Sequence, residues 1–382
     1  MRERVVVAPD KFKGSLTAAE VAARVAAGLV RAGFTGEIES LPVADGGDGT
    51  VAAAVSAGFN RVELGVHGPT GKNVTASYAL LGDTAVIEAA QACGLSLLSP
   101  GCLAPLTATS RGVGELILTA SRMGARRIVL GVGGVATTDG GAGLLQALGA
   151  RLTDSKGREL PPGGAALARL AALDLAPLRD LSGIEFLLAS DVDNPLLGPS
   201  GAAAVYGPQK GASPEDVRLL EEGLLRWANV AEATAGAATA GAAATVRDAP
   251  GAGAAGGIGF AALLFLGARM RPGIELLLEL ASFGSRLDGA RLVITGEGSL
   301  DEQTLHGKAP VGVARAAAAH RPAVPVVAVA GRCTLTPGEL RAAGISRAYP
   351  LSDHEPDVGR SIAAAGPLVE RLAERIAADW LR

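Results

Sequence analysis

The sequence predicts an α/β protein built on a doubly wound parallel sheet, and three observations lead to this fold class. Short apolar runs rich in Val, Ile, Leu and Ala recur along the 382 residues, as is typical of strands buried in a parallel sheet. Amphipathic helix patterns separate several of these runs, so strand and helix alternate. A carboxylate follows five of the runs, at the end of the strand where open α/β sheets bind their ligands.

The N-terminal elements form a βαβ unit. Residues 5–8 predict a strand, and Thr17 with Glu20 forms a capping box that begins a helix. This helix is expected to end near Gly33, and residues 37–44 supply the next strand.

Antiparallel strands are expected between residues 61 and 89. Residues 74–78 partly alternate between apolar and polar side chains, and Gly82 with Asp83 is a hairpin turn signal before the apolar residues 85–87. This pattern differs from the βα rhythm and indicates a second kind of sheet.

The central part of the chain returns to helices and buried strands. A helix over 113–123 is expected to end at Gly124, and strands follow at 128–132 and 186–190. Two further helices are expected, one after Gly143 and one beginning with Ser213 as the N-cap and Pro214 at the first helical position.

The C-terminal part repeats the βα pattern. It predicts strands at 292–295 and 324–330, a helix at 311–320, and a helix that begins at Thr336 and Pro337. Both ends of the chain therefore build one doubly wound domain, expected over 1–65 and 275–382. A second α/β domain with antiparallel strands is inserted over 66–274.

Composition excludes several classes of protein. A formal net charge of −3 and the absence of a Lys/Arg block argue against a nucleic-acid partner. The longest apolar tract, 258–268, is about half of what a bilayer requires, so no membrane association is expected. Three cysteines without a CxxC pair favour a cytoplasmic protein.

Acids and glycines after the strands point to phosphoryl transfer. Several converging carboxylates call for a cation, and Mg²⁺ is the ion expected, while glycines allow backbone N–H groups to approach an anion. The five strand ends carry Asp10, Asp45, Asp139, Asp191 and Glu297. Asp45 and Glu297 are expected in Gly-rich loops. The alternative for each acid is that it only caps a following helix.

The Gly-rich segment 250–257 leads into an apolar run and predicts an anion-binding turn at a helix N-terminus. Gly251, Gly253 and Gly256 also match GxGxxG, but the residues before them form a poor strand, so a nicotinamide site is only weakly supported. Neither Gly71-Lys72 nor Gly307-Lys308 continues to Ser or Thr, so no Walker A loop is present. A nicotinamide-dependent hydroxyacid dehydrogenase and a non-enzymatic hydroxyacid-binding protein remain alternatives.

Long ordered motifs over nearly the whole chain resemble the bacterial type I glycerate kinases. The resemblance rests on residues 7–16, 42–50, 109–115, 131–143, 190–196, 207–212, 250–257 and 294–308. The chain departs from the family pattern at Val135, where the family has Ser, and at Asp193, where it has Thr. The resemblance implies a flavodoxin-like domain with an inserted domain similar to the restriction-endonuclease fold. It also implies ATP-dependent phosphorylation of D-glycerate to 2-phosphoglycerate, with 3-phosphoglycerate as the alternative product, by a monomer or homodimer.

Roles for individual residues follow as hypotheses. Lys13, Arg111 and Lys308 are expected to bind the substrate carboxylate and the phosphoryl group, because each lies in a glycine-bearing loop near a predicted helix start. Asp191 is the expected general base, and Asp45 is expected to accept the substrate hydroxyl. Metal-holding roles fall to Glu297 and Asp301. Further substrate- or phosphate-binding positions are Ser15, Asp139, Asn194, His306, Gly251, Gly253 and Gly256. The other histidines, His67, His320 and His354, are expected to be surface residues.

Overall fold

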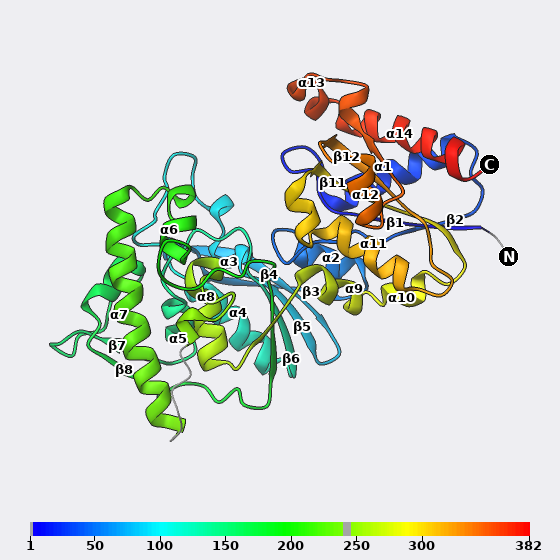
Figure 1. Cartoon of the computed structure of the whole chain (residues 1–382). Coiled ribbons are helices and arrows are strands. Elements are labelled where there is room, and N and C mark those ends of the chain that lie inside the picture. Colours follow the sequence, from blue (N-terminus) through cyan, green and yellow to red (C-terminus); the bar gives the residue numbers. More distant parts are fainter. Residues whose placement is uncertain (1–2, 240–245) are drawn as a thin grey trace. The chain divides into compact units, whose positions relative to one another are not determined.

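The computed structural model describes residues 3–239 and 246–382, and the chain forms two compact units (Figure 1). The first unit combines Met1–Asp45, Ala52–Gly58 and Pro272–Arg382, and the second combines Gly46–Val51 with Phe59–Arg271. The domain boundaries that the sequence predicts at residues 65 and 275 stay a prediction. In the described part of the chain, no helix is long and apolar enough to cross a membrane.

A five-stranded parallel sheet forms the centre of the first unit. Its strands are β1 (Arg4–Pro9), β2 (Glu37–Ser40), β11 (Ala290–Leu300), β12 (Val326–Cys333) and β13 (Arg347–Pro350). The spatial order β13-β12-β11-β1-β2 is the flavodoxin-like order, so the predicted doubly wound sheet is confirmed. The strand order reverses between β1 and β11, which are contributed by opposite ends of the chain.

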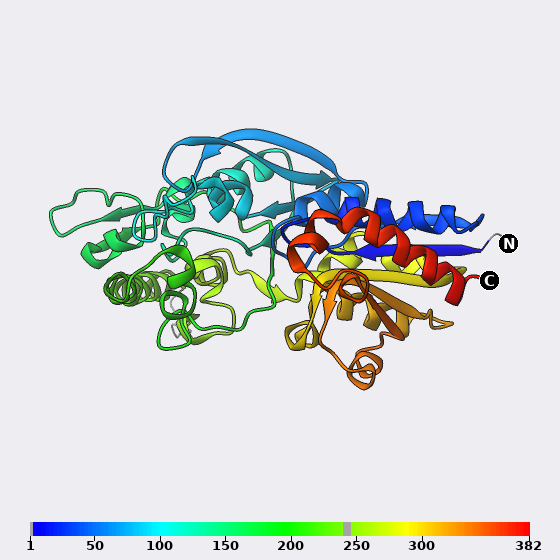
Figure 2. The same cartoon turned by 90° about the horizontal axis from the view of Figure 1, so that it is seen from above.

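Helices cover both faces of this sheet (Figure 2). Val5 and Val7 pack with α1 (Ala18–Arg31) and α14 (Ala365–Trp380), whereas Val6 and Ala8 belong to the core on the opposite face. That opposite face is covered by α9 (Gly273–Leu280), α10 (Phe283–Arg286), α11 (Ala309–Ala319) and α12 (Pro337–Ala342). The alternation follows from the two-residue period of strand side chains, and it buries both faces.

The capping box predicted at Thr17 is present. Thr17 Oγ1 accepts a hydrogen bond from the Glu20 backbone N at 3.2 Å, and the Glu20 carboxylate accepts one from the Thr17 backbone N at 2.8 Å. Thr336 and Glu339 make the same reciprocal pair at the start of α12. These helix starts were set by local sequence, because each cap satisfies backbone donors within one turn.

Close packing of α1 against α14 depends on Gly28. A Cβ added at Gly28 would lie 2.2 Å from the Glu370 backbone O and 2.6 Å from the Ala373 Cβ. We therefore expect Gly28→Val to lower the free energy of unfolding by about 1–3 kcal/mol through overpacking, measured by urea denaturation. Val30→Ala, an exposed position on the same helix, should change it by less than about 0.5 kcal/mol. Equal effects of the two substitutions would contradict this account.

The second unit contains a six-stranded mixed sheet of order β10-β9-β6-β5-β4-β3. Its strands are β3 (Asn60–His67), β4 (Asn73–Leu81), β5 (Thr84–Glu88), β6 (Arg127–Gly131), β9 (Glu185–Ala189) and β10 (Arg269–Arg271). The pairs β3–β4 and β4–β5 are antiparallel and the remaining pairs are parallel, so the antiparallel strands that the sequence predicts are confirmed. A small two-stranded sheet joins β7 (Arg151–Thr153) and β8 (Ala172–Asp174).

The main helices of the second unit are α4 (Arg111–Arg122), α5 (Ala142–Ala147), α6 (Ala202–Tyr206), α7 (Pro214–Thr239) and α8 (Ala254–Phe265). Trp227 of α7 is fully buried and donates its indole N–H to the Gly140 backbone O at 2.9 Å. This contact fixes the loop that precedes α5.

Two expected boundaries were wrong. Residues 41–44 are not part of β2, although their backbone still follows β1: Leu41 N donates to Val7 O at 2.8 Å and Val43 N to Pro9 O at 2.9 Å. Glu297 lies within β11 rather than in a loop, because pairing with β12 continues as far as Leu300. Glycine neighbours do not end a strand whose partner strand extends alongside it.

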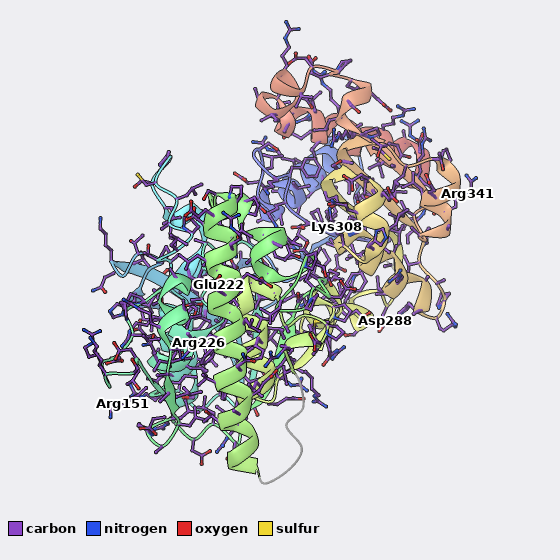
Figure 3. The ribbon with its side chains drawn as sticks, turned by 60° about the vertical axis from the view of Figure 1, so that its left-hand side comes forward. Arg151, Glu222, Arg226, Asp288, Lys308 and Arg341 are labelled. Carbon is purple, nitrogen blue, oxygen red and sulfur yellow. The ribbon has the colours of Figure 1, made fainter. Side chains whose placement is uncertain are left out.

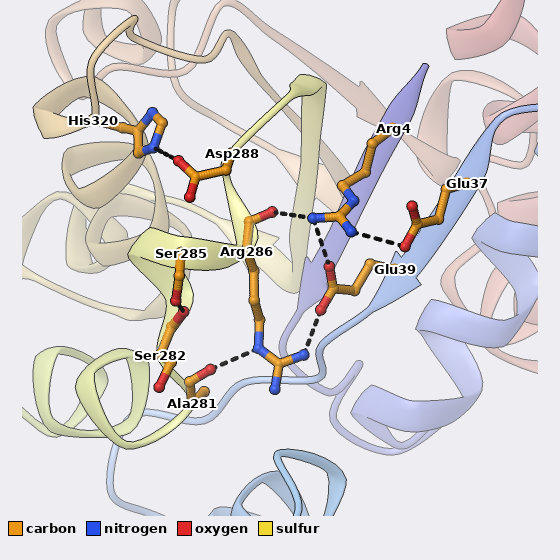
Figure 4. Close-up of polar contacts among 9 residues, drawn as sticks. All are labelled: Arg4, Glu37, Glu39, Ala281, Ser282, Ser285, Arg286, Asp288 and His320. Atoms are coloured by element: carbon orange, nitrogen blue, oxygen red, sulfur yellow. Dashed lines mark hydrogen bonds and ion pairs between the residues drawn. The ribbon is translucent and has the colours of Figure 1, made fainter. Parts of the chain in front are cut away.

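Ion pairs hold the N-terminal end of the first unit's sheet together (Figure 4). Arg4 on β1 contacts Glu37 at 2.9 Å and Glu39 at 3.7 Å, both on β2. Arg286 also pairs with Glu39, and its Nε donates to the Ala281 backbone O at 2.6 Å. The positive and negative charges of this cluster pair with one another, and they lie at the strand ends opposite to Asp10. Their role is therefore to stabilise the fold.

Candidate active site

The carboxyl ends of β1 and β11 bring two acids together at the point where the strand order reverses. Pro9 lies beside Gly296 in the sheet, and the Asp10 backbone N donates to the Gly296 backbone O at 2.8 Å. Asp10 follows Pro9 and Glu297 follows Gly296, so the two carboxylates belong to adjacent strands. Ligands of open α/β sheets bind at this kind of switch point.

Asp10 is 7% exposed, and burial raises its pKa to about 6. Repulsion from Asp45 adds to this increase, while Lys11 opposes it. Lys11 donates its backbone N–H to Asp10 Oδ1 at 2.6 Å and places Nζ 3.6 Å from the same oxygen. Sequence reasoning noted Asp10 at a strand end but assigned it no role, because its burial depends on segments distant in sequence.

Glu297 is also 7% exposed, and burial raises its pKa to about 7. Repulsion from Asp10 and Asp301 contributes to the increase. The fully buried Thr304 donates its hydroxyl to Glu297 Oε1, and Lys308 lies close enough to favour the carboxylate form. A strongly raised carboxyl pKa with specific charged neighbours marks a candidate functional site.

Asp301 caps the short 3₁₀ helix Glu302–His306. Its Oδ1 accepts from Gln303 N at 3.1 Å and its Oδ2 from the Ser299 hydroxyl at 3.0 Å. The capping alternative considered for each acid therefore describes Asp301 well. His306 is exposed, and its Nδ1 lies 2.9 Å from the Glu302 backbone O.

Lys13 and Lys308 belong to loops of the same unit that flank β11. The turn containing Lys13 lies against β11, because a Cβ added at Gly298 would be 3.4 Å from the Lys13 backbone N. Lys308, labelled in Figure 3, immediately precedes α11 and donates Nζ to Gln303 at 3.2 Å. Ser15 uses its hydroxyl within the turn, where it donates to the Phe12 backbone O at 3.1 Å.

In the second unit, Asp139 joins the N-termini of α4 and α5. The carboxylate is 1% exposed and accepts from Ser110 N at 2.8 Å, the Ser110 hydroxyl at 2.9 Å, Gly141 N at 3.1 Å and Gly143 N at 3.2 Å. These donors occupy most of its acceptor capacity. Asp139 is thus built to position the loop after β6 and the start of α4, where Arg111 is the first residue.

Asp191 and Asn194 lie in the loop after β9. Asp191 is exposed. The side chain of Asn194 is committed to the loop itself, since it accepts from the Tyr206 hydroxyl at 2.6 Å and donates to the Ser200 backbone O at 2.8 Å.

The glycines around the start of α8 serve close packing. A Cβ at Gly253 would lie 2.2 Å from the Pro195 backbone O, and one at Gly256 would lie 2.1 Å from the Thr137 backbone O. Gly251 is left-handed, with φ +81°. The segment before them, Val246–Asp248, is a 3₁₀ helix and not a strand, so the strand required by a dinucleotide fingerprint is missing there.

Two buried charged residues of the second unit escaped sequence reasoning. Lys210 is 5% exposed and donates Nζ to the Thr137 backbone O at 2.6 Å, and burial lowers its pKa to about 8. Glu88 is 2% exposed, and it accepts from Gly49 N at 3.2 Å and Val51 N at 3.1 Å. Both residues hold motif loops in place, and no local pattern distinguishes them from exposed charges.

Among the described residues, no group of three or more His, Cys, Asp or Glu side chains is arranged to hold a metal ion by itself. The pair Asp10 and Glu297 nevertheless fits Mg²⁺, which is typically bound by one or two carboxylates together with substrate phosphates. Burial is the main reason that both pKa values are raised, and a cation there would offset the carboxylate repulsion that adds to it.

Buried acids and lysines lie at the switch point of a flavodoxin-like sheet. This arrangement is typical of enzymes that bind small anionic ligands. Comparison with known proteins is more specific, because the family model described as "Glycerate kinase family" matches residues 5–381. The chain belongs to the glycerate kinase family, whose members are phosphotransferases.

Individual relatives agree with this assignment. The chain is 43% identical over 380 residues to the glycerate kinase of Bacillus subtilis (strain 168), covering 98% of this chain and 97% of the relative. It is 42% identical over 351 residues to the glycerate 2-kinase of Escherichia coli (strain K12), covering 91% and 90%. A crystal structure of a protein assigned as glycerate kinase 2 from Salmonella typhimurium LT2 matches with a TM-score of 0.84 and 40% identity, covering 99% and 98% of the two chains.

Proposed function

We propose that this kinase transfers the γ-phosphoryl group of ATP to the 2-hydroxyl of D-glycerate and forms 2-phosphoglycerate. The observation that carries the proposal is the buried pair of acids, Asp10 and Glu297, beside lysines at the switch point. The name of the Escherichia coli relative, a glycerate 2-kinase, supports the position of phosphorylation.

Asp10 and Glu297 would hold Mg²⁺ with the nucleotide phosphates, and the ion would neutralise charge on the transferred group. Asp301 caps the 3₁₀ helix that carries Thr304, and its metal-holding role beside Glu297 stays a prediction. Thr304 in turn fixes Glu297 through its hydroxyl.

Basic side chains supply the remaining charge. Lys13 and Lys308 would bind phosphate oxygens, and Arg111 would bind the glycerate carboxylate, for which its planar guanidinium is suited. Asp45 would accept a hydrogen bond from a hydroxyl group of the bound substrate. Ser15 and His306 would contribute donors from their loops.

Asp191 would act as the general base that takes the proton of the attacking hydroxyl, a role for which its exposure at the end of β9 is suitable. Asp139, Asn194 and the three packing glycines would hold the surrounding loops. Their side chains or Cα atoms are already in contact with other protein groups.

The reaction is tested by incubating the purified protein with ATP, Mg²⁺ and D-glycerate and recording the phosphorus NMR spectrum of the product. We expect 2-phosphoglycerate, and we expect chelation of the divalent cation to abolish turnover because phosphoryl transfer depends on charge neutralisation. Formation of 3-phosphoglycerate would refute the regiochemistry. Full activity in excess chelator would refute the metal requirement.

A further inference from the structure

Three ionisable side chains meet where β3 ends beside the N-terminus of α4. His67 is the last residue of β3, and Glu115 lies in the second turn of α4. Glu115 Oε2 accepts from the His67 backbone N at 2.8 Å, and its Oε1 lies 2.6 Å from His67 Nδ1. Both carboxylate oxygens are therefore fixed by one residue.

The same carboxylate contacts Arg111, one helical turn earlier. Arg111 Nε lies 3.4 Å from Glu115 Oε1, and this Nε is buried without an aligned hydrogen-bond partner. In the part of the chain that the structure describes, Glu115 is the one carboxylate paired with Arg111. The Arg111 side chain as a whole is 40% exposed.

The position of Arg111 is unfavourable for the helix alone. A cation at a helix N-terminus opposes the helix dipole, and an Arg preceding a Glu by four residues is the weaker orientation of such a pair. The helix dipole disfavours a cation there and this pair stabilises it only weakly, so the helix by itself gains little from Arg111. An anion bound at that end of the helix would interact favourably with both the guanidinium and the dipole.

Backbone packing makes this cluster rigid. A Cβ added at Gly112 would lie 2.2 Å from the His67 backbone O, so α4 begins in direct contact with the end of β3. The Thr109 backbone N also donates to the Pro69 backbone O at 2.9 Å. The relative positions of His67, Glu115 and Arg111 are thus set by the strand and the helix.

We propose that Glu115, held by His67, is a positioning residue that orients the Arg111 guanidinium for the carboxylate of the hydroxyacid substrate. The proposal rests on the proposed function, in which Arg111 binds that carboxylate. By fixing the Nε edge of the guanidinium, Glu115 leaves the two terminal nitrogens to form a bidentate pair with an anion. Pre-orientation lowers the entropy lost when the substrate binds.

The test is steady-state kinetics of the full-length protein with D-glycerate and saturating MgATP. Glu115→Ala is expected to raise KM for glycerate about five- to tenfold with a smaller change in kcat, as for loss of one coupled contact. Glu115→Gln keeps the side-chain volume and one acceptor oxygen and should have a smaller effect. Glu185→Gln is the matched control, because it removes an arginine pair at the N-terminal ends of β6 and β9 and should leave KM unchanged.

A double-mutant cycle separates positioning from a merely structural role. If Glu115 acts through Arg111, Glu115→Ala should raise KM no further in an Arg111→Ala background. Two results would overturn the positioning role and leave the proposed function intact. One is that the effects of the two substitutions on KM are fully additive. The other is that Arg111→Ala raises KM while Glu115→Ala leaves KM normal. A normal KM in Arg111→Ala would overturn the positioning role and the assignment of Arg111 to the substrate carboxylate, whereas absence of phosphoglycerate from the wild-type protein would overturn the proposed function. Thermal unfolding of each variant confirms that folded proteins are being compared.

Discussion

Replacing Glu297 by Gln is expected to abolish most activity and, at the same time, to stabilise the protein. The substitution removes a carboxylate that we propose holds Mg²⁺, and we expect kcat/KM to fall about a hundredfold or more. The side-chain volume is nearly unchanged, and the amide oxygen can still accept the Thr304 hydroxyl. Loss of activity would therefore reflect loss of charge.

The gain in stability follows from burial of the carboxyl group. In the unfolded chain Glu297 ionises near its ordinary pKa of 4.5, whereas in the folded protein its pKa is about 7. The folded state binds the proton more tightly, so wild-type stability decreases as pH rises from about 4.5 to 7. Above this window the Gln variant should be more stable by about 1–3 kcal/mol, and the difference should vanish below it.

Urea denaturation from pH 4 to pH 8 measures this difference, in buffers of constant ionic strength and without divalent cations. Glu275→Gln provides the control, because it removes an exposed acid from α9 of the same unit and should give a difference independent of pH. A Glu297→Gln variant with wild-type turnover would exclude the catalytic role. If the free energies of unfolding of the wild type and of Glu297→Gln differed by the same amount at every pH, burial of the Glu297 carboxyl group would be excluded as the cause.

Asp191→Asn is expected to lower kcat by about 10²- to 10⁴-fold, the contribution of a general base. KM for glycerate and for ATP should change little, because proton transfer occurs in the transition state and the amide preserves the shape of the side chain.

Asp193→Asn is the matched control for this experiment. Asp193 is an exposed acid two residues further along the same loop, and its replacement changes the local charge equally. We expect near-normal kcat in this variant. Equal losses in the two variants would indicate a general electrostatic effect of the loop, and near-normal kcat in Asp191→Asn would eliminate it as the base.

Local sequence determined most of the fold. The apolar runs at 5–8 and 128–132 became buried strands, and the capping boxes at Thr17 and Thr336 began helices at the predicted residues. Such signals are readable because they depend on side-chain periodicity and on hydrogen bonds within one turn. The mixed character of the second sheet followed in the same way from the hairpin signal at Gly82 and Asp83.

Only the tertiary structure decided what each charged residue does. Asp139 and Glu297 both stand among glycines at the end of an apolar run. The Asp139 carboxylate is saturated by backbone donors, whereas the Glu297 carboxyl group is buried and has a raised pKa. Lys210 carried no local signal of its burial and His67 none of its pairing with Glu115, because desolvation and pairing are imposed by segments far away in the sequence. The sequence thus determined which segments form the strands, and long-range packing determined where β2 and β11 end and which of the acids near the strand ends are available for chemistry.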